Sequence, residues 1–117
     1  MLAVGCSGKK IRKFDVTLSN NSEPMLQDVF VAFDGFKDDS GYLPPSKGKG
    51  RKTYMRVHEE HPEIPEKATI GWTTPDKKKH TTEVAVKSKM PSGNSKLNII
   101  FTINADDTVT VSYEELK

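Results

Sequence analysis

Apolar and polar side chains alternate over most of the chain from residue 13 onward. This period of two is typical of β-strands that bury one face. The first such run places Phe14, Val16 and Leu18 on one face, with Asp15 and Thr17 between them. We therefore expect a strand here, with an apolar inner face and a polar outer face.

Further runs of the same kind predict the remaining strands. They cover residues 29–33, 53–57, 68–73, 83–87, 97–104 and 109–113. The run 29–33 is apolar on both faces, which is typical of a central strand. The last two runs flank the turn residues 105–107, so together they predict a β-hairpin.

Turn-forming residues separate these runs. Pro75 presets the backbone angle that a turn over residues 74–77 requires. Residues 34–51 are rich in glycine, proline and lysine, and we expect them to form the longest irregular segment. Residues 58–66 are predicted to be a polar, proline-broken connection.

The element pattern predicts an all-β fold, because no run shows the apolar period of a helix. About seven short strands with regularly spaced turns are typical of an antiparallel β-sandwich of the immunoglobulin-like kind. We expect residues 13–117 to form this single domain, with Trp72 in its core and residues 1–12 as a flexible tether. The chain holds one cysteine, Cys6, so the sandwich has no internal disulfide.

Composition narrows the classes of function. The 117-residue chain is 34% hydrophobic and 29% charged, as in a globular domain. Its net charge is only +2, whereas nucleic-acid-binding domains usually carry a strong basic excess. We therefore expect no nucleic-acid partner. No apolar run approaches the roughly 20 residues that a membrane-spanning helix needs.

The N-terminal residues Leu2-Ala3-Val4-Gly5-Cys6 hold an apolar run, then small side chains, then a cysteine. This order resembles the lipobox of bacterial lipoproteins, whose cysteine receives the lipid. The resemblance implies a lipid anchor on Cys6 and a place in the cell envelope, facing the periplasm; Ser7 is compatible with an outer membrane. Only five residues precede Cys6, fewer than the roughly 15–30 of a complete signal peptide. The alternative is a fortuitous match in a cytoplasmic interaction domain.

Two basic stretches are candidate contact surfaces. The first contains Lys47, Lys49 and Arg51, and the second contains Lys77, Lys78 and Lys79. Brought together, they would form a patch for an acidic partner. The alternative is a solvated loop and a charged hairpin tip that discourages edge pairing. We expect these six residues to contact a protein partner.

No catalytic set is visible in the sequence. His58 and His61 flank two glutamates, but Pro62 follows at once and the spacing differs from the His-Glu-x-x-His of zinc proteases. The glycine-rich and acidic segments match neither a phosphate-binding loop nor an EF-hand. We therefore expect no cofactor and no enzymatic activity. The alternative is a metal or small-ligand carrier that uses His58, His61 and His80.

These observations favour a membrane-tethered, non-enzymatic periplasmic protein that binds an envelope protein. At the level of architecture, the chain looks like periplasmic immunity lipoproteins or secretion-accessory lipoproteins. No motif of such a family matches residue by residue, so the resemblance implies a mode of action and no particular partner.

Overall fold

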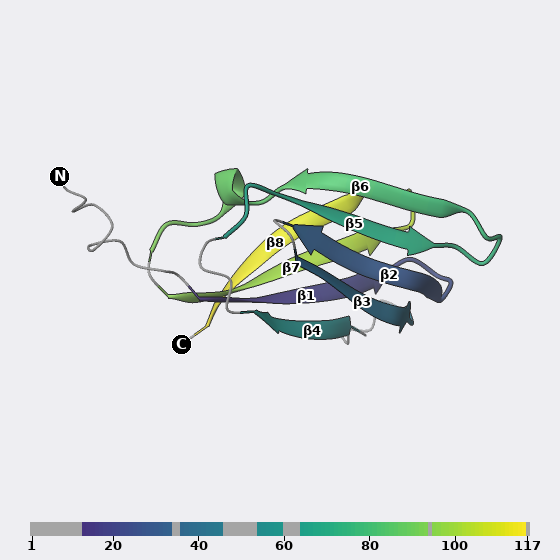
Figure 1. Cartoon of the computed structure of the whole chain (residues 1–117), viewed down its shortest axis with the longest axis horizontal. Coiled ribbons are helices and arrows are strands. Elements are labelled where there is room, and N and C mark those ends of the chain that lie inside the picture. Colours follow the sequence, from purple (N-terminus) through teal and green to yellow (C-terminus); the bar gives the residue numbers. More distant parts are fainter. Residues whose placement is uncertain (1–12, 34–35, 46–53, 60–63, 94, 117) are drawn as a thin grey trace.

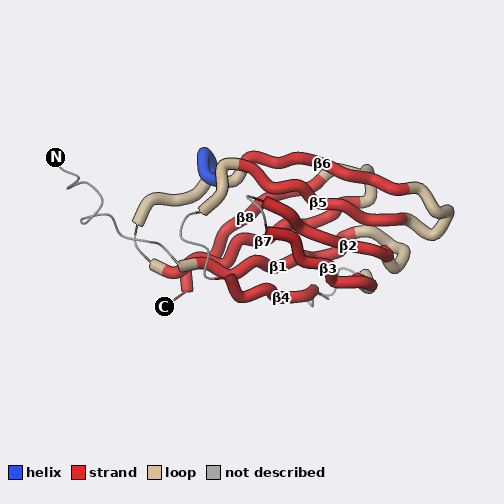
Figure 2. The backbone as a smooth tube through the Cα atoms, in the orientation of Figure 1, coloured by secondary structure: helices blue, strands red, loops and turns tan. Residues whose placement is uncertain are grey.

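The computed structural model of the chain describes residues 13–33, 36–45, 54–59, 64–93 and 95–116. They form two β-sheets that pack face to face (Figure 1). The strands are β1 (Phe14–Asn21), β2 (Leu26–Phe33), β3 (Phe36–Leu43), β4 (Tyr54–Glu59), β5 (Lys67–Thr73), β6 (Lys79–Ala85), β7 (Lys96–Asn104) and β8 (Val109–Leu116). A 3-10 turn, η1 (Lys87–Lys89), follows β6 and is the helical segment seen in Figure 2.

The strand order is β4-β1-β7-β8 in one sheet and β3-β2-β5-β6 in the other. The predicted all-β sandwich is therefore confirmed, and β2 is central as its two apolar faces predicted. The described residues hold eight strands, one more than expected. The additional strand is β3, which lies inside the 34–51 segment that we expected to be irregular. It is an edge strand, and its exposed side can carry the charged residues that hid it.

The sandwich is antiparallel except for one pair. β1 and β7 run parallel, from Phe14 opposite Leu97 to Asn21 opposite Asn104. Parallel neighbours need a long connection between them, and here the other five described strands intervene in the chain. The centre of this sheet therefore joins the first strand to the next-to-last one.

Inward-facing apolar side chains from both sheets form one core. Seventeen hydrophobic side chains of the described residues are buried in this core. Trp72 is the largest of those that are fully buried. The predicted core position of Trp72 is confirmed, since its residue is 2% exposed.

A bulge in β2 explains why Leu26 and Val29 are both buried although three positions separate them. In a regular strand such residues would face opposite sides of the sheet. Asp28 takes a left-handed backbone conformation, with φ at 49°, and the pairing registers with β3 and β5 shift at this point. The extra residue turns the strand so that both apolar side chains reach the core.

The outer face of β1 is polar but not exposed. Asp15, Thr17 and Ser19 are each 2% exposed or less. The Thr17 hydroxyl donates a hydrogen bond of 2.7 Å to Asn98 Oδ1, and Lys96 Nζ lies 3.3 Å from Asp15 Oδ1. Alternation correctly placed these side chains away from the core, but it could not show that Lys96 and Asn98 of β7 contact Asp15 and Thr17 on this outer face.

Tyr113 on β8 links the edges of the two sheets. Its hydroxyl donates a hydrogen bond of 2.6 Å to the carbonyl of Val86, which follows β6. The partial burial of this side chain raises the pKa of the Tyr113 hydroxyl above its usual value. The hydroxyl therefore remains a donor, and β6 and β8 are held side by side.

Candidate functional site

Three connections gather at one end of the sandwich, which we call the loop end (Figure 1). They are the β1–β2 connection (22–25), the β5–β6 tip (74–78) and the β7–β8 tip (105–108). The pairing of Asn21 with Asn104 and of Gln27 with Thr73 places them together. The chain enters β1 at the other end, and eight extended residues at about 3.3 Å each put roughly 26 Å between the two ends.

The two hairpin tips have the same backbone structure. Lys77 N donates to Thr74 O at 2.8 Å, and Asp107 N donates to Asn104 O at 3.0 Å. Lys77 and Asp107 then take left-handed conformations, with φ of 69° and 67°. This is the three-residue hairpin loop in which a type I turn is followed by a left-handed residue. The turn predicted over residues 74–77 is confirmed.

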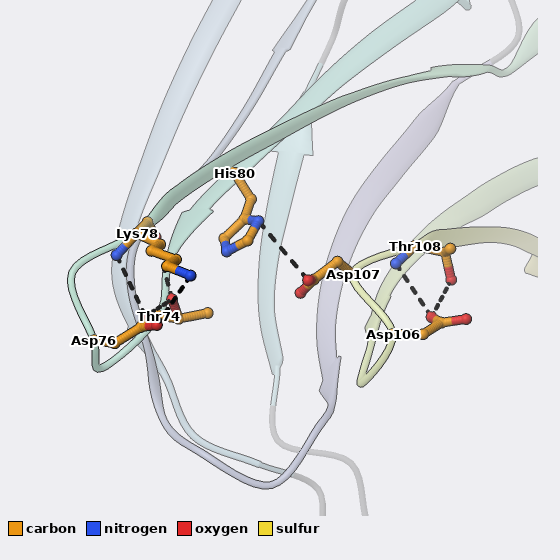
Figure 3. Close-up of polar contacts among 7 residues, drawn as sticks. All are labelled: Thr74, Asp76, Lys78, His80, Asp106, Asp107 and Thr108. Carbon is orange, nitrogen blue, oxygen red and sulfur yellow. Dashed lines mark hydrogen bonds and ion pairs between the residues drawn. The ribbon is translucent and has the colours of Figure 1, made fainter.

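An aspartate fixes each tip (Figure 3). Asp76 accepts hydrogen bonds from the Thr74 hydroxyl and from the backbone N–H of Lys78. Asp106 accepts from the hydroxyl and the N–H of Thr108, at 2.6 and 3.2 Å. These bonds, above all those from the threonine hydroxyls, favour the carboxylate and lower the pKa of both aspartates. Both tips therefore carry a fixed negative charge.

His80, near the start of β6, contacts residues of both sheets. Its ring stacks on Trp72, with centroids 5.4 Å apart and planes 13° from parallel. Its Nδ1 atom lies 4.0 Å from Asp107 Oδ2 on the β7–β8 tip (Figure 3). The Trp72–His80 pair comes from β5 and β6, whereas Asp107 comes from the other sheet, so this contact closes the loop end over the core.

Hollows of about 230, 310 and 430 Å³ surround the Trp72–His80 pair. Trp72 lines the first two, and His80 lines the first and the third. The second, which we call the mouth hollow, lies between the β1–β2 connection and the two tips. Leu26, Trp72 and Ile103 line it, together with Glu23 and Asp107. Its volume lies at the lower end of the range of about 300–1,000 Å³ that ligand pockets occupy.

Two exposed apolar side chains also lie at or beside the loop end. Met25 is 46% exposed and Tyr42 is 66% exposed, and they are the large hydrophobic residues that the described part of the chain leaves open to solvent. Met25 belongs to the β1–β2 connection, and Tyr42 precedes Leu43, which pairs with Leu26. Sequence reasoning missed both, because nothing in an isolated Met or Tyr distinguishes an exposed side chain from a core one.

The structure describes three of the six predicted contact residues. Lys77 and Lys78 lie on the β5–β6 tip and Lys79 begins β6; all three are exposed. Lys47, Lys49, Arg51 and the proposed lipid-attachment residue Cys6 lie outside the described residues. β3 precedes the first basic stretch and ends at Leu43, which pairs with Leu26 at the loop end of β2. β4 follows this stretch and begins at Tyr54, which pairs with Ser19 near the loop end of β1.

Two of the histidines considered as a carrier site, His58 and His80, lie in different sheets. His58 on β4 pairs with Asp15 near the start of β1, whereas His80 pairs with Trp72 at the loop end of the other sheet. His61 lies outside the described residues. In the described part of the chain, no three His, Cys, Asp or Glu side chains converge as metal ligands. None of the described helices is long and apolar enough to cross a membrane.

The described residues therefore form an open β-sandwich, and three of the connections between its strands lie at the loop end. No protein-family model matches the sequence, and no curated protein is similar to it. A solved structure, the NMR structure of the protein from Eubacterium rectale, is similar over 91% of this chain and 92% of that one. The TM-score is 0.56 and the sequence identity is 13%, so this likeness establishes the fold alone.

Proposed function

We propose that this chain is a non-enzymatic binding protein of the bacterial cell envelope, anchored by lipid on Cys6 and facing the periplasm. Its loop end holds a protein partner, in the manner of immunity or secretion-accessory lipoproteins. The proposal combines the lipobox-like N-terminus with the surface at the loop end.

The exposure of Met25 and Tyr42 at or beside the loop end, where Lys77, Lys78 and Lys79 are exposed as well, is the observation that carries the proposal. Met and Tyr are enriched at protein interfaces relative to the rest of protein surfaces. The lysines add a charged rim that steers an acidic partner. A tether before β1 would leave this end pointing away from the membrane.

Photo-crosslinking from the loop end tests the partner surface. With p-benzoylphenylalanine at position 25 or 42 of the full chain in its native cell, we expect one dominant crosslinked protein, because these side chains lie within the interface. The matched control is position 112 on β8, where Ser112 is exposed on the outer face of the other sheet. Crosslinks that are identical from position 112, or that are absent from positions 25 and 42, would contradict the proposal.

Mass spectrometry of the native protein tests the anchor. We expect Cys6 to be the first residue of the native protein and to carry acyl chains. Each CH₂ of these chains that is buried in the membrane contributes about 0.8 kcal/mol to membrane binding. A Cys6→Ser variant should leave the membrane fraction while keeping its circular dichroism spectrum. An unmodified thiol on Cys6 of the native protein would refute the anchor without bearing on the partner surface.

A further inference from the structure

The mouth hollow has a rigid apolar floor. Leu26, Trp72 and Ile103 form it, from β2 and β5 in one sheet and β7 in the other, and each is at most 2% exposed. The floor therefore belongs to the core and does not collapse into the hollow of about 310 Å³ above it. This volume suits one long side chain.

The charged groups that line the mouth hollow all have one sign. Glu23 stands on the β1–β2 connection and Asp107 on the β7–β8 tip, so acidic residues line the hollow from two connections. Lys77, Lys78 and Lys79 are not among the residues that line it. The charge of the hollow is thus opposite to that of the tip lysines.

The polar side chains at the rim of the hollow donate hydrogen bonds to other residues of this chain. The Ser22 hydroxyl donates to Asn20 Oδ1, and the Thr74 hydroxyl donates to Asp76. The Asn104 amide donates to the hydroxyls of Thr108 and Thr110. The side-chain oxygens of these three rim residues can still accept hydrogen bonds, and the two carboxylates accept only.

We propose that the mouth hollow is the receptor for one arginine side chain of the protein partner. Guanidinium has five N–H donors and no acceptor, which matches a rim of acceptors with two carboxylates. Its long stem occupies the hollow of about 310 Å³, which a free small cation would leave largely to water. This inference rests on the proposed function and specifies what the partner presents at its centre.

An NMR titration of the full chain with N-acetyl-arginine amide tests the receptor. We expect saturable shifts of the Trp72 indole and of the Leu26 and Ile103 methyl groups, with a dissociation constant in the millimolar range. Asp107→Asn and Glu23→Gln should each weaken binding about three- to tenfold, the effect of losing a partly exposed charged hydrogen bond. Asn suits the left-handed conformation of residue 107, so this variant keeps the tip.

Matched controls separate the receptor from general attraction. Asp106→Asn removes the same charge one residue earlier, outside the hollow, and should leave the affinity unchanged. N-acetyl-norleucine amide should give no saturable shift. Equal responses to norleucine and arginine, or equal losses in the 106 and 107 variants, would overturn the proposal. Arginine that fails to bind while positions 25 and 42 still crosslink would refute the receptor and leave the proposed function standing.

Discussion

Replacing Trp72 with alanine is expected to lower the free energy of unfolding by about 3–5 kcal/mol, the usual cost of removing a large aromatic side chain from a core. The indole is 2% exposed, stacks on His80 and lines two hollows of the loop end. Since domains of this size are stable by only about 5–15 kcal/mol, the variant should unfold at much lower urea concentration. Urea titration followed by circular dichroism measures the difference.

Trp72→Phe is the control for this prediction. It keeps an aromatic ring against His80 and loses less buried volume, so its cost should fall well below that of the alanine variant. A Trp72→Ala loss of less than about 1 kcal/mol would be typical of a surface site, and would show that the two sheets do not close around the indole.

Replacing Gly71 with alanine is expected to destabilise the fold by about 1–3 kcal/mol, the usual cost of overpacking. A Cβ atom on Gly71 would lie 2.1 Å from Cε2 of Phe30, which pairs with it across β2 and β5. Moving the ring away would disturb its contact with the Lys37 ammonium, whose Nζ lies 4.6 Å from the ring centroid. Thermal and urea unfolding of the variant measure the loss.

A double-mutant cycle with Phe30→Ala identifies the cause of that loss. Without the ring, Gly71→Ala should become neutral or slightly stabilising, because alanine costs less backbone entropy than glycine in a strand. If Gly71→Ala were equally costly in both backgrounds, the clash with Phe30 would not be its origin.

The strands that alternation predicted most clearly are those whose apolar residues alternate over five or more positions. β7 and β8 are the clearest example, and their hairpin was predicted with its turn. β3 was missed because its residues include Asp38, Asp39, Ser40 and Gly41, which indicate a loop when they are read locally. An edge strand tolerates them, and only the pairing with β2 shows that they form one.

Pairings and bulges depend on contacts between distant residues and were outside the reach of periodicity. The parallel β1–β7 pair joins residues more than eighty positions apart, and the Thr17–Asn98 hydrogen bond has a sequence separation of 81. The bulge at Asp28 shifts the phase of alternation inside β2. A pattern with a fixed period cannot represent such a shift.

The exposure of the lysines at the β5–β6 hairpin could be predicted from the local sequence. Lys77, Lys78 and Lys79 were recognised because a turn with Pro75 places its lysines in solvent. The mouth hollow was not, since its residues come from the β1–β2 connection, three strands and two hairpin tips that only the assembled sandwich brings together. The role of Trp72 as both core residue and hollow floor likewise required the structure.

The parallel pairing of β1 with β7 has a consequence for biogenesis. β1 cannot complete its hydrogen bonds until β7, near the end of the chain, has emerged. Such distant pairings slow folding, typically to milliseconds or seconds. Under the proposed export, the sheet β4-β1-β7-β8 would therefore be completed only after most of the chain has crossed the membrane.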